Sequence, residues 1–477
     1  MLHSLFRRLG LAAGLAVLAS GCAVAPFDSA RPIADEILWD RWGVPHIYAS
    51  DDTTLFFGMG WAQMENHGEL ILRLYGESRG RAAEYWGEDY RSGLGVPGLD
   101  SDRFVRTLGL PDRGAAAWAA QSPEARERVQ AFVDGVNAWA EDNRDRLDDA
   151  VEVVLPVTGV DVLTHADRAR ALFLARGASR QARRILARGA EGSTAALAGS
   201  PEVQWGSSAW AVGPSRSASG NALLMGNPHV PWFDITTWHE HHLVAPGVNA
   251  YGATFVGTAG ISMGFNQRLG WSATVNRHDG ADLYVLELEG DGYRFGDEIR
   301  PFEHRVETLR VRRADGSVDD VSLPIRSSVH GPVLAADTER AVALRLAGIE
   351  RYGRPEQSWE MARAQTLEEF EAAMRRLRIP MFNYLYADAD GHIFYLFNAT
   401  VPRRARGDVA FWAGAVDGTD PSLLWTEYHD YDELPRLLDP STGWLQNAND
   451  PPWTSTLPSP LRRSDFPPYL SPSGMGA

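Results

Sequence analysis

The chain has 477 residues, of which 44% are hydrophobic and 16 are Trp, a composition typical of a globular enzyme with a large core. Its formal net charge of −16 argues against nucleic acid as a partner, because phosphate binding needs clustered Lys and Arg. The sequence also has no Walker-type phosphate loop and no paired-cysteine zinc spacing.

The N-terminus has the pattern of an export signal. Two arginines precede an apolar run, 9–18, that is too short to span a bilayer as a permanent helix. Small residues then lead to Cys22, the only cysteine, so we predict that 1–22 is a lipoprotein signal peptide and that Cys22 carries the lipid. Cleavage after Ala25 is the alternative, which a proline at the next position disfavours. We therefore expect a bacterial periplasmic protein, held at the membrane only by a lipid anchor and without an internal disulfide.

The next region, 23–187, has mostly helical patterns. Ser122 and Pro123 form a helix start, with the serine as cap and the proline in the first turn. Apolar residues at helical spacing follow: Val129, Phe132, Val133, Val136 and Trp139. A second helical run, 166–186, is arginine-rich on one side, which indicates a solvated face. Small residues with Gly and Pro over 188–206 then indicate a linker.

From residue 207 to residue 477 the patterns are those of strands. Two hairpins are predicted, each from two strands joined by a glycine-containing turn: 306–313 with 318–325, and 384–387 with 393–398. A helix capped by Thr366, with Glu369 three residues later, interrupts them. Helices in the first half and strands in the second predict an α+β fold.

The candidate nucleophile is Ser207, which follows Gly206 and precedes a short apolar strand, 208–213, with Trp210 and Val212 on one face. A serine hydroxyl is a weak nucleophile until a base takes its proton. If the chain is cut just before Ser207, the freed α-amine, with a pKa near ~8, becomes that base. A Gly-Ser pair alone carries little weight, since such pairs are usually loop residues.

Other motifs at matching distances make the pattern specific. They are His229 within Asn-Pro-His, and the segments 37–49, 58–65, 80–84, 270–276, 330–333 and 445–450. Together with Ser207 they resemble the penicillin acylase family of N-terminal-nucleophile hydrolases, and most of all its acyl-homoserine-lactone and aculeacin acylases. The resemblance covers nearly everything after the leader. It implies an αββα sandwich, in which two antiparallel sheets lie between helical layers.

The resemblance also implies a reaction. Cleavage between Gly206 and Ser207 would leave a heterodimer, with 23–187 as α-chain region, 188–206 as excised spacer and 207–477 as β-chain region. Ser207 would then hydrolyse the amide between an acyl chain and an amine, in an acyl-homoserine lactone, a lipopeptide or a β-lactam side chain. The family histidine that orients the nucleophile matches His229. Its oxyanion donors, a backbone N–H and an asparagine side chain, match Val275 and Asn449, with Asn447 as the alternative to Asn449.

A metal site is a weaker implication. Asp279 and Asp282 match two carboxylates that bind calcium in penicillin acylases proper. Calcium takes about six to eight oxygen ligands, and the glutamate expected near 180–184 is absent from the sequence. Turn aspartates are the alternative, and no cofactor is implied for the chemistry itself.

Two rival interpretations remain. The segment 260–264 has the G-x-S-x-G form of a nucleophile elbow around Ser262, but no helical run follows it, so we interpret 264–270 as a loop. Family chains also continue well past the motif at 445–450, through an active-site arginine that has no counterpart before Ala477. The second rival is therefore a truncated, non-catalytic lipoprotein remnant of the family.

Overall fold

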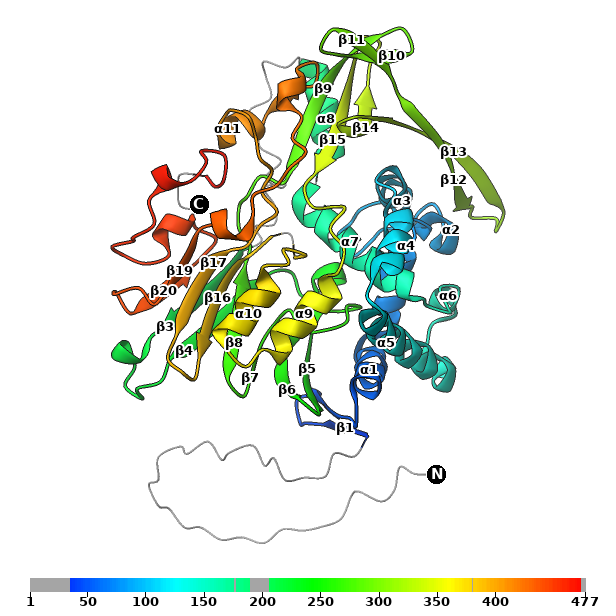
Figure 1. Ribbon diagram of the computed structural model, residues 1–477. Coiled ribbons are helices and arrows are strands. Elements are labelled where there is room, and N and C mark those ends of the chain that lie inside the picture. The colour runs from blue at the N-terminus through cyan, green and yellow to red at the C-terminus, as the bar shows by residue number, and fades with distance from the viewer. Residues whose placement is uncertain (1–34, 176, 189–205, 380, 473–477) are drawn as a thin grey trace. The chain divides into compact units, whose positions relative to one another are not determined.

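The computed structural model describes residues 35–175, 177–188, 206–379 and 381–472 (Figure 1). The predicted signal peptide, Cys22 and nearly all of the linker 188–206 lie outside the described residues. Helices make up most of the first region and strands most of the second, so the predicted α+β fold is confirmed. In the described part of the chain, no helix is long and apolar enough to cross a membrane.

The first region is a helical layer that packs closely on itself. The backbones of α1 and α5 nearly touch: a Cβ at Gly60 would lie 2.0 Å from the carbonyl oxygen of Phe132, and one at Gly135 would lie 2.0 Å from that of Phe57. Only glycine fits at either contact. The helices are α1 (Asp52–Ser78), α2 (Ala82–Trp86), α3 (Gly98–Thr107), α4 (Leu110–Ala120), α5 (Pro123–Asp142), α6 (Asp149–Glu152), α7 (Gly159–Ala175) and α8 (Ala178–Arg188).

Two sequence predictions for this layer had different outcomes. Ser122 does cap α5, and its Oγ accepts a hydrogen bond from Ala125 N at 3.2 Å. The solvated arginine face over 166–186 is wrong in its first half, because Arg168 and Arg170 are buried and form ion pairs with Glu77 and Asp167. Asp167 belongs to α7 itself, but Glu77 comes from α1, 91 positions away, and a charge run along one helix does not reveal such a partner.

The largest sheet has nine strands in the order β1-β2-β5-β6-β7-β8-β16-β17-β19. Their bounds are β1 (Glu36–Trp39), β2 (Pro45–Tyr48), β5 (Trp238–Ala245), β6 (Val248–Phe255), β7 (Met263–Asn266), β8 (Leu269–Thr274), β16 (Asn383–Asp388), β17 (Ile393–Phe397) and β19 (Arg436–Leu438). Helices α9 (Arg354–Arg363) and α10 (Leu367–Met374) cover one face, seen in front of the strands in Figure 1. There the ring of Phe370 lies 6.3 Å from that of Trp271. The predicted cap is confirmed, since Thr366 accepts from Glu369 N.

A three-stranded sheet packs against the opposite face of the nine-stranded sheet. It has the order β20-β3-β4, with β20 (Trp444–Asn447), β3 (Gly206–Val212) and β4 (Leu223–His229). The two sheets approach so closely that a Cβ at Gly226 would lie 2.0 Å from Ser272 Oγ. The outer face of β3 is open in the described part of the chain, where Trp210 is 45% exposed. Two facing sheets, antiparallel except for the pairing of β2 with β5, with helices outside the larger sheet, agree with the implied sandwich.

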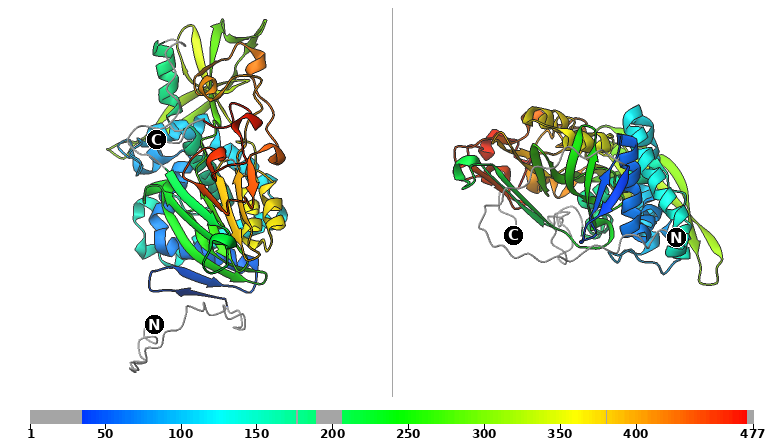
Figure 2. Two further views of the ribbon diagram at one scale, coloured as in Figure 1. Left: turned by 90° about the vertical axis from the view of Figure 1, so that its left-hand side faces the viewer. Right: turned by 90° about the horizontal axis from the view of Figure 1, so that it is seen from below.

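A further sheet has the order β11-β10-β9-β15-β14-β13-β12, and β18 (Ala415–Asp417) pairs with β9 in parallel. Its strands are β9 (Ala281–Glu289), β10 (Gly292–Phe295), β11 (Glu298–Pro301), β12 (Glu303–Arg312), β13 (Val318–Ser328), β14 (Gly331–Ala336) and β15 (Arg340–Leu346), and α11 (Val409–Trp412) lies beside β18. Both predicted hairpins are confirmed, as β12–β13 and β16–β17. The β12–β13 hairpin extends beside the helices of the first region (Figure 2).

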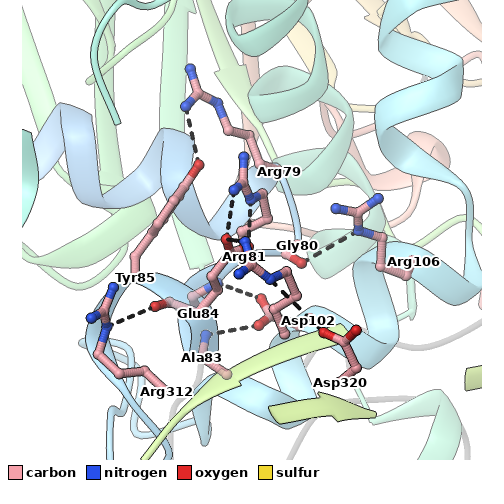
Figure 3. A network of polar contacts seen from close by, with 12 residues as sticks. Arg79, Gly80, Arg81, Ala83, Glu84, Tyr85, Asp102, Arg106, Arg312 and Asp320 are labelled. Atoms are coloured by element: carbon pink, nitrogen blue, oxygen red, sulfur yellow. Dashed lines mark hydrogen bonds and ion pairs between the residues drawn. The ribbon is translucent and has the colours of Figure 1, made fainter. Parts of the chain in front are cut away.

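The motif at 80–84 lies where the β12–β13 hairpin meets the helices of the first region (Figure 3). The carboxylate of Asp102 accepts hydrogen bonds from the backbone nitrogens of Ala82 and Ala83, both at 2.8 Å, at the start of α2. Glu84 then accepts from Arg81 and from Arg310 of β12, each at 2.7 Å. The motif therefore joins the first region to the β12–β13 hairpin and makes no contact with Ser207.

Candidate active site

Ser207 lies on the central strand of the three-stranded sheet. In the antiparallel pairing of β3 with β4, Gly206 stands opposite His229 and Ser207 opposite Pro228. Alternation along β3 turns Ser207 toward the nine-stranded sheet and leaves it only 5% exposed. The predicted strand over 208–213 therefore begins earlier, at Gly206, and its less buried face carries Trp210 and Val212.

Asn449 is hydrogen-bonded to Ser207, the candidate nucleophile. Its Oδ1 accepts from the backbone nitrogen of Ser207 at 2.7 Å, and its Nδ2 donates to the backbone oxygen of Val275 at 2.7 Å. Because a backbone N–H can only donate, these two contacts define which end of the amide faces Ser207. Asn449 has a left-handed backbone with φ of +66°, which asparagine tolerates better than most residues.

Asn447 forms hydrogen bonds with other residues. Its Oδ1 accepts from Thr274 Oγ1 at 2.6 Å, from Asn383 Nδ2 at 3.0 Å and from the backbone nitrogen of Asn449 at 2.8 Å. Its Nδ2 donates to the backbone oxygen of Asp450 at 2.9 Å. The Asn447 side chain thus joins β20, β8 and β16 and supports Asn449, and it makes no hydrogen bond to Ser207.

The peptide before Ser207 lies between Asn449 and His229. A Cβ at Gly206 would lie 3.0 Å from Asn449 Oδ1 and 3.9 Å from His229 Nδ1, so a larger residue would crowd both groups. His229 is exposed at the end of β4, and its ring makes no hydrogen bond with any residue that the structure describes. The structure therefore brings Ser207, Val275 and Asn449 together, with His229 beside the peptide.

An apolar cavity opens at Ser207. Its apolar lining comes from α7, from strands β4 to β8 and the loops after β4 and β8, and from β16 with the segment before it: Phe173, Pro228, Val230, Trp238, Phe255, Met263, Ala273, Val275, Ile379, Phe382 and Tyr384. Three polar side chains complete the lining: Ser262, Arg354 and Ser358. A cavity of this composition suits a hydrocarbon chain that ends at the serine.

Ser262 is hydrogen-bonded within the protein. Thr258 Oγ1 donates to Phe255 O at 2.6 Å, so Thr254 Oγ1, 2.8 Å away, must donate to Thr258. The proton of Thr254 is thereby used, and Ser262 Oγ donates in turn to Thr254 Oγ1 at 3.0 Å. No histidine takes part in this chain of hydroxyls. The predicted loop over 264–270 is wrong, because strands β7 and β8 occupy most of it, but no helix follows Ser262.

The two candidate calcium ligands, Asp279 and Asp282, form ion pairs with an arginine. Arg404 Nη2 donates to both oxygens of Asp282, at 2.7 and 2.8 Å, and Arg404 Nη1 lies 3.4 Å from Asp279 Oδ2. Trp425 Nε1 donates to Asp282 at 2.6 Å. Burial, with the nearby Asp282 charge, raises the pKa of Asp279. In the described residues no group of three metal-ligating side chains exists, and with a guanidinium on Asp282 these residues do not fit calcium.

Sequence reasoning missed Arg404 as the partner of Asp282, because the two are 122 positions apart and Arg404 belongs to no motif. It also missed Arg354 at the cavity. Neither residue carries a local signal, since each acquires its role only when α9 or the 401–406 segment packs against the sheets.

Comparisons with known proteins identify the family. The chain matches the penicillin amidase family over residues 35–471. It is 28% identical over 480 residues to the acyl-homoserine lactone acylase PvdQ of Pseudomonas fluorescens, with 91% of this chain and 61% of that protein covered. It is 26% identical over 494 residues to the penicillin acylase 2 proenzyme of Pseudomonas sp. (strain SE83), with 90% and 60% covered. The chain thus spans about three-fifths of the length of these curated relatives.

Among solved structures, the thermostable penicillin G acylase from Alcaligenes faecalis is similar with a TM-score of 0.46 and 26% identity, over 51% of this chain and 44% of that chain. The family match extends over nearly all of the described residues and includes Ser207, His229 and Asn449. The chain belongs to the penicillin amidase family.

Proposed function

We propose that this chain is a self-processing acylase, a hydrolase of carbon–nitrogen bonds in linear amides that uses Ser207 as its N-terminal nucleophile. One observation carries the proposal: the Gly206–Ser207 peptide is hydrogen-bonded by Asn449 and flanked by His229 at the mouth of an apolar cavity. A nucleophile, a hydrogen-bonding amide and an apolar recess beside the nucleophile are among the parts that acyl transfer needs.

Maturation comes first. Ser207 Oγ attacks the carbonyl carbon of Gly206, the C–N bond breaks, and the nitrogen of Ser207 takes the hydroxyl proton as an ester forms. Water then hydrolyses this ester, which frees the Gly206 carboxyl group and restores the hydroxyl. The nitrogen that now donates to Asn449 Oδ1 becomes an α-amine, and the same hydrogen bond orients its lone pair toward Oγ.

Amide hydrolysis follows with the same groups. The α-amine of Ser207 takes the proton of Oγ, which attacks the substrate carbonyl, and the leaving amine departs with that proton. Water then releases the acyl group as a carboxylate. Asn449 Nδ2 has two hydrogens and Val275 O accepts one, so the second is free to donate to the developing oxyanion. His229, exposed beside Gly206, is proposed to orient the nucleophile.

Terminal sequencing and intact-mass analysis of the purified chain test the maturation step. We expect a fragment that begins with Ser207, and we expect Ser207→Ala to remain a single chain. The matched control is Ser208→Ala, on the opposite face of β3, which should still be cleaved. An intact wild-type chain that hydrolyses amides would refute the mechanism, and an intact, inactive chain would support the non-catalytic remnant.

The substrate class is proposed from the cavity and the relatives together. The lining is almost wholly apolar, and relatives are named as acyl-homoserine lactone acylases. We therefore expect hydrolysis of long-chain acyl-homoserine lactones, with His229→Ala lowering turnover. Ser262→Ala should leave it unchanged, and activity lost only with Ser262→Ala would move the chemistry to that serine.

Export and anchoring are proposed from the sequence alone. Cys22 would carry a diacylglyceryl group, whose two acyl chains suffice for stable membrane binding. Cys22→Ser should then move the protein from the membrane fraction to the soluble periplasmic fraction. Equal fractionation of both forms would support cleavage after Ala25 instead. The processed protein is proposed to be a heterodimer of the two chains.

A further inference from the structure

A network of buried polar side chains joins the two facing sheets. Its members are Tyr395 of β17, Asn383 of β16, Thr274 of β8 and Asn447 of β20. None of the four is more than 1% exposed. The first three strands belong to the nine-stranded sheet and β20 belongs to the three-stranded sheet, so the network crosses from one sheet to the other.

The backbone nitrogen of Asn449 fixes the direction of the hydrogen bonds in this network. A backbone N–H can only donate, so the atom of Asn447 that faces it at 2.8 Å is the acceptor Oδ1. The end of Asn383 that lies 3.0 Å from this oxygen must then be the donor Nδ2, which leaves its Oδ1 to accept from Tyr395 Oη at 2.7 Å. Neither amide can rotate end for end without setting two acceptors, or two donors, against each other.

Thr274 and Tyr395 complete the network. Asn383 Nδ2 also donates to Thr274 Oγ1 at 3.1 Å, so the proton of that hydroxyl goes to Asn447 Oδ1 at 2.6 Å. Burial, with the nearby charge of Asp450, raises the pKa of Tyr395, so its hydroxyl keeps the proton that it donates. A network in which each member has its partners holds those members in one arrangement.

The network ends on Asn449, the residue that contacts the candidate nucleophile. Asn447 Oδ1 accepts from the Asn449 nitrogen, where φ is +66°, a left-handed backbone that residues other than glycine adopt at a cost. From this backbone the Asn449 side chain reaches Ser207 N and Val275 O, both at 2.7 Å. The position of the proposed oxyanion donor therefore depends on one acceptor, whose orientation the network fixes.

We propose that Asn383, held by Tyr395, is a positioning residue for amide hydrolysis, which acts through Asn447 to keep the Asn449 side chain aimed at the reacting groups. The inference rests on the proposed function, because Asn449 is an oxyanion donor only in that mechanism. Replacing all partners of a buried hydrogen bond by apolar groups of the same shape can leave stability nearly unchanged. What the network adds is a single defined arrangement beside the nucleophile.

Steady-state kinetics on processed protein test the proposal. Tyr395→Phe removes only the hydroxyl that holds Asn383, and it should lower kcat about fivefold with little change in KM, because the Asn449 donor acts in the transition state. Tyr386→Phe is the matched control, since Tyr386 is also fully buried and loses one hydrogen bond, to Asp388, on the face that packs against α10. In an Asn449→Gly chain, Tyr395→Phe should cause no further fall in kcat. Equal values of kcat in the two tyrosine variants would count against the proposal.

Thr274 offers a conservative rescue. Thr274→Val removes the hydroxyl with little change in shape and should also lower kcat about fivefold. Thr274→Ser keeps the hydroxyl and should keep most of the turnover. If Thr274→Ser loses as much turnover as Thr274→Val, packing rather than the hydrogen bond decides the effect, and the positioning role is refuted.

Amide hydrogen exchange tests the positioning without catalysis. In the Ser207→Ala chain the amide at position 207 should still donate to Asn449 Oδ1, so its exchange reports how firmly Asn449 is held. Tyr395→Phe should speed this exchange about fivefold relative to Tyr386→Phe. If the wild type is cleaved and active but the two tyrosine variants agree in both exchange and kcat, the positioning proposal falls and the acylase proposal stands. If the wild type is never cleaved while the exchange differs as expected, the network holds Asn449 and the catalytic proposal falls.

Discussion

The side chain of Asn449 accepts a hydrogen bond from the backbone nitrogen of Ser207 at 2.7 Å, across 242 positions of the chain. The other end of the same amide donates to Val275 O, also at 2.7 Å. This amide therefore joins the nucleophile-bearing strand to the end of β8. In the proposed mechanism, this one polar group lies within reach of both the α-amine that cleavage would free and the reacting carbonyl.

Substitutions can separate the acceptor role of the Asn449 oxygen from the donor role of its nitrogen. Asn449→Gly keeps the left-handed backbone at φ +66° but removes both contacts, so we expect turnover to fall by about 100-fold or more. Asn449→Asp keeps the acceptor for the Ser207 nitrogen and loses the donor, so cleavage should persist while turnover falls with little change in KM. Terminal sequencing and steady-state kinetics on processed protein check this, and full activity of Asn449→Asp would contradict the oxyanion role.

Asn447 should affect stability more than chemistry. Asn447→Leu would leave Thr274 Oγ1, Asn383 Nδ2 and the Asn449 nitrogen without their acceptor, at a cost of about 1–3 kcal/mol for each buried group. Urea unfolding measures the loss. The control is Gln446→Leu on the opposite face of β20, which removes a single side-chain hydrogen bond to Thr454 O. Equal destabilisation by both substitutions would contradict the supporting role of Asn447.

The buried pair of Asp282 and Arg404 makes a prediction about calcium. Arg404→Met would leave Asp282 charged and unpaired in the core, which should cost about 3–5 kcal/mol. Arg403→Met, which removes an exposed ion pair with Glu433, should cost no more than about 1 kcal/mol. Neither calcium nor a chelator should shift the unfolding midpoint of the wild-type protein, and a rise with calcium would show that these residues bind it.

Buried histidines predict loss of stability in mild acid. Burial, together with the charge of its neighbour His242, lowers the pKa of His241 to about 3. The unfolded chain takes up a proton on His241 below pH ~6.5, whereas the folded chain does so only near pH ~3. The stabilising contribution is therefore complete above pH ~6.5 and is lost, by about 1.4 kcal/mol per pH unit, as the pH falls.

His241→Phe removes this titration without losing a hydrogen bond, because neither ring nitrogen of His241 has a partner among the residues that the structure describes. Denaturant unfolding between pH ~7 and pH ~5 should show a shallower pH dependence for the variant than for the wild type. His392 is a control of opposite sign, because its hydrogen bond with Asp439 raises its pKa. Its contribution is present at low pH and is lost as the pH rises through the raised pKa. A wild-type slope retained in His241→Phe would contradict the assignment.

The sequence by itself determined the structural features that depend only on residues close together in the chain. The Ser122 and Thr366 caps, the β12–β13 and β16–β17 hairpins and the Gly206–Ser207 strand all follow from patterns a few residues long. Such patterns predict local structure because turns, caps and alternation are satisfied by near neighbours. The family resemblance likewise depends on short motifs at matching distances.

Only the tertiary structure shows that Asn449, and not its alternative Asn447, is hydrogen-bonded to Ser207, since the two asparagines lie two positions apart and differ in what surrounds them. It also placed Arg404 on Asp282 and Arg354 in the lining of the cavity beside Ser207. Partners in the Asn449 and Arg404 contacts lie more than 100 positions apart, and Arg354 reaches the cavity only because α9 packs against the large sheet. Long-range packing carries no local sequence signature, because whether a charge or an amide is buried, paired or left free depends on which distant segment covers it.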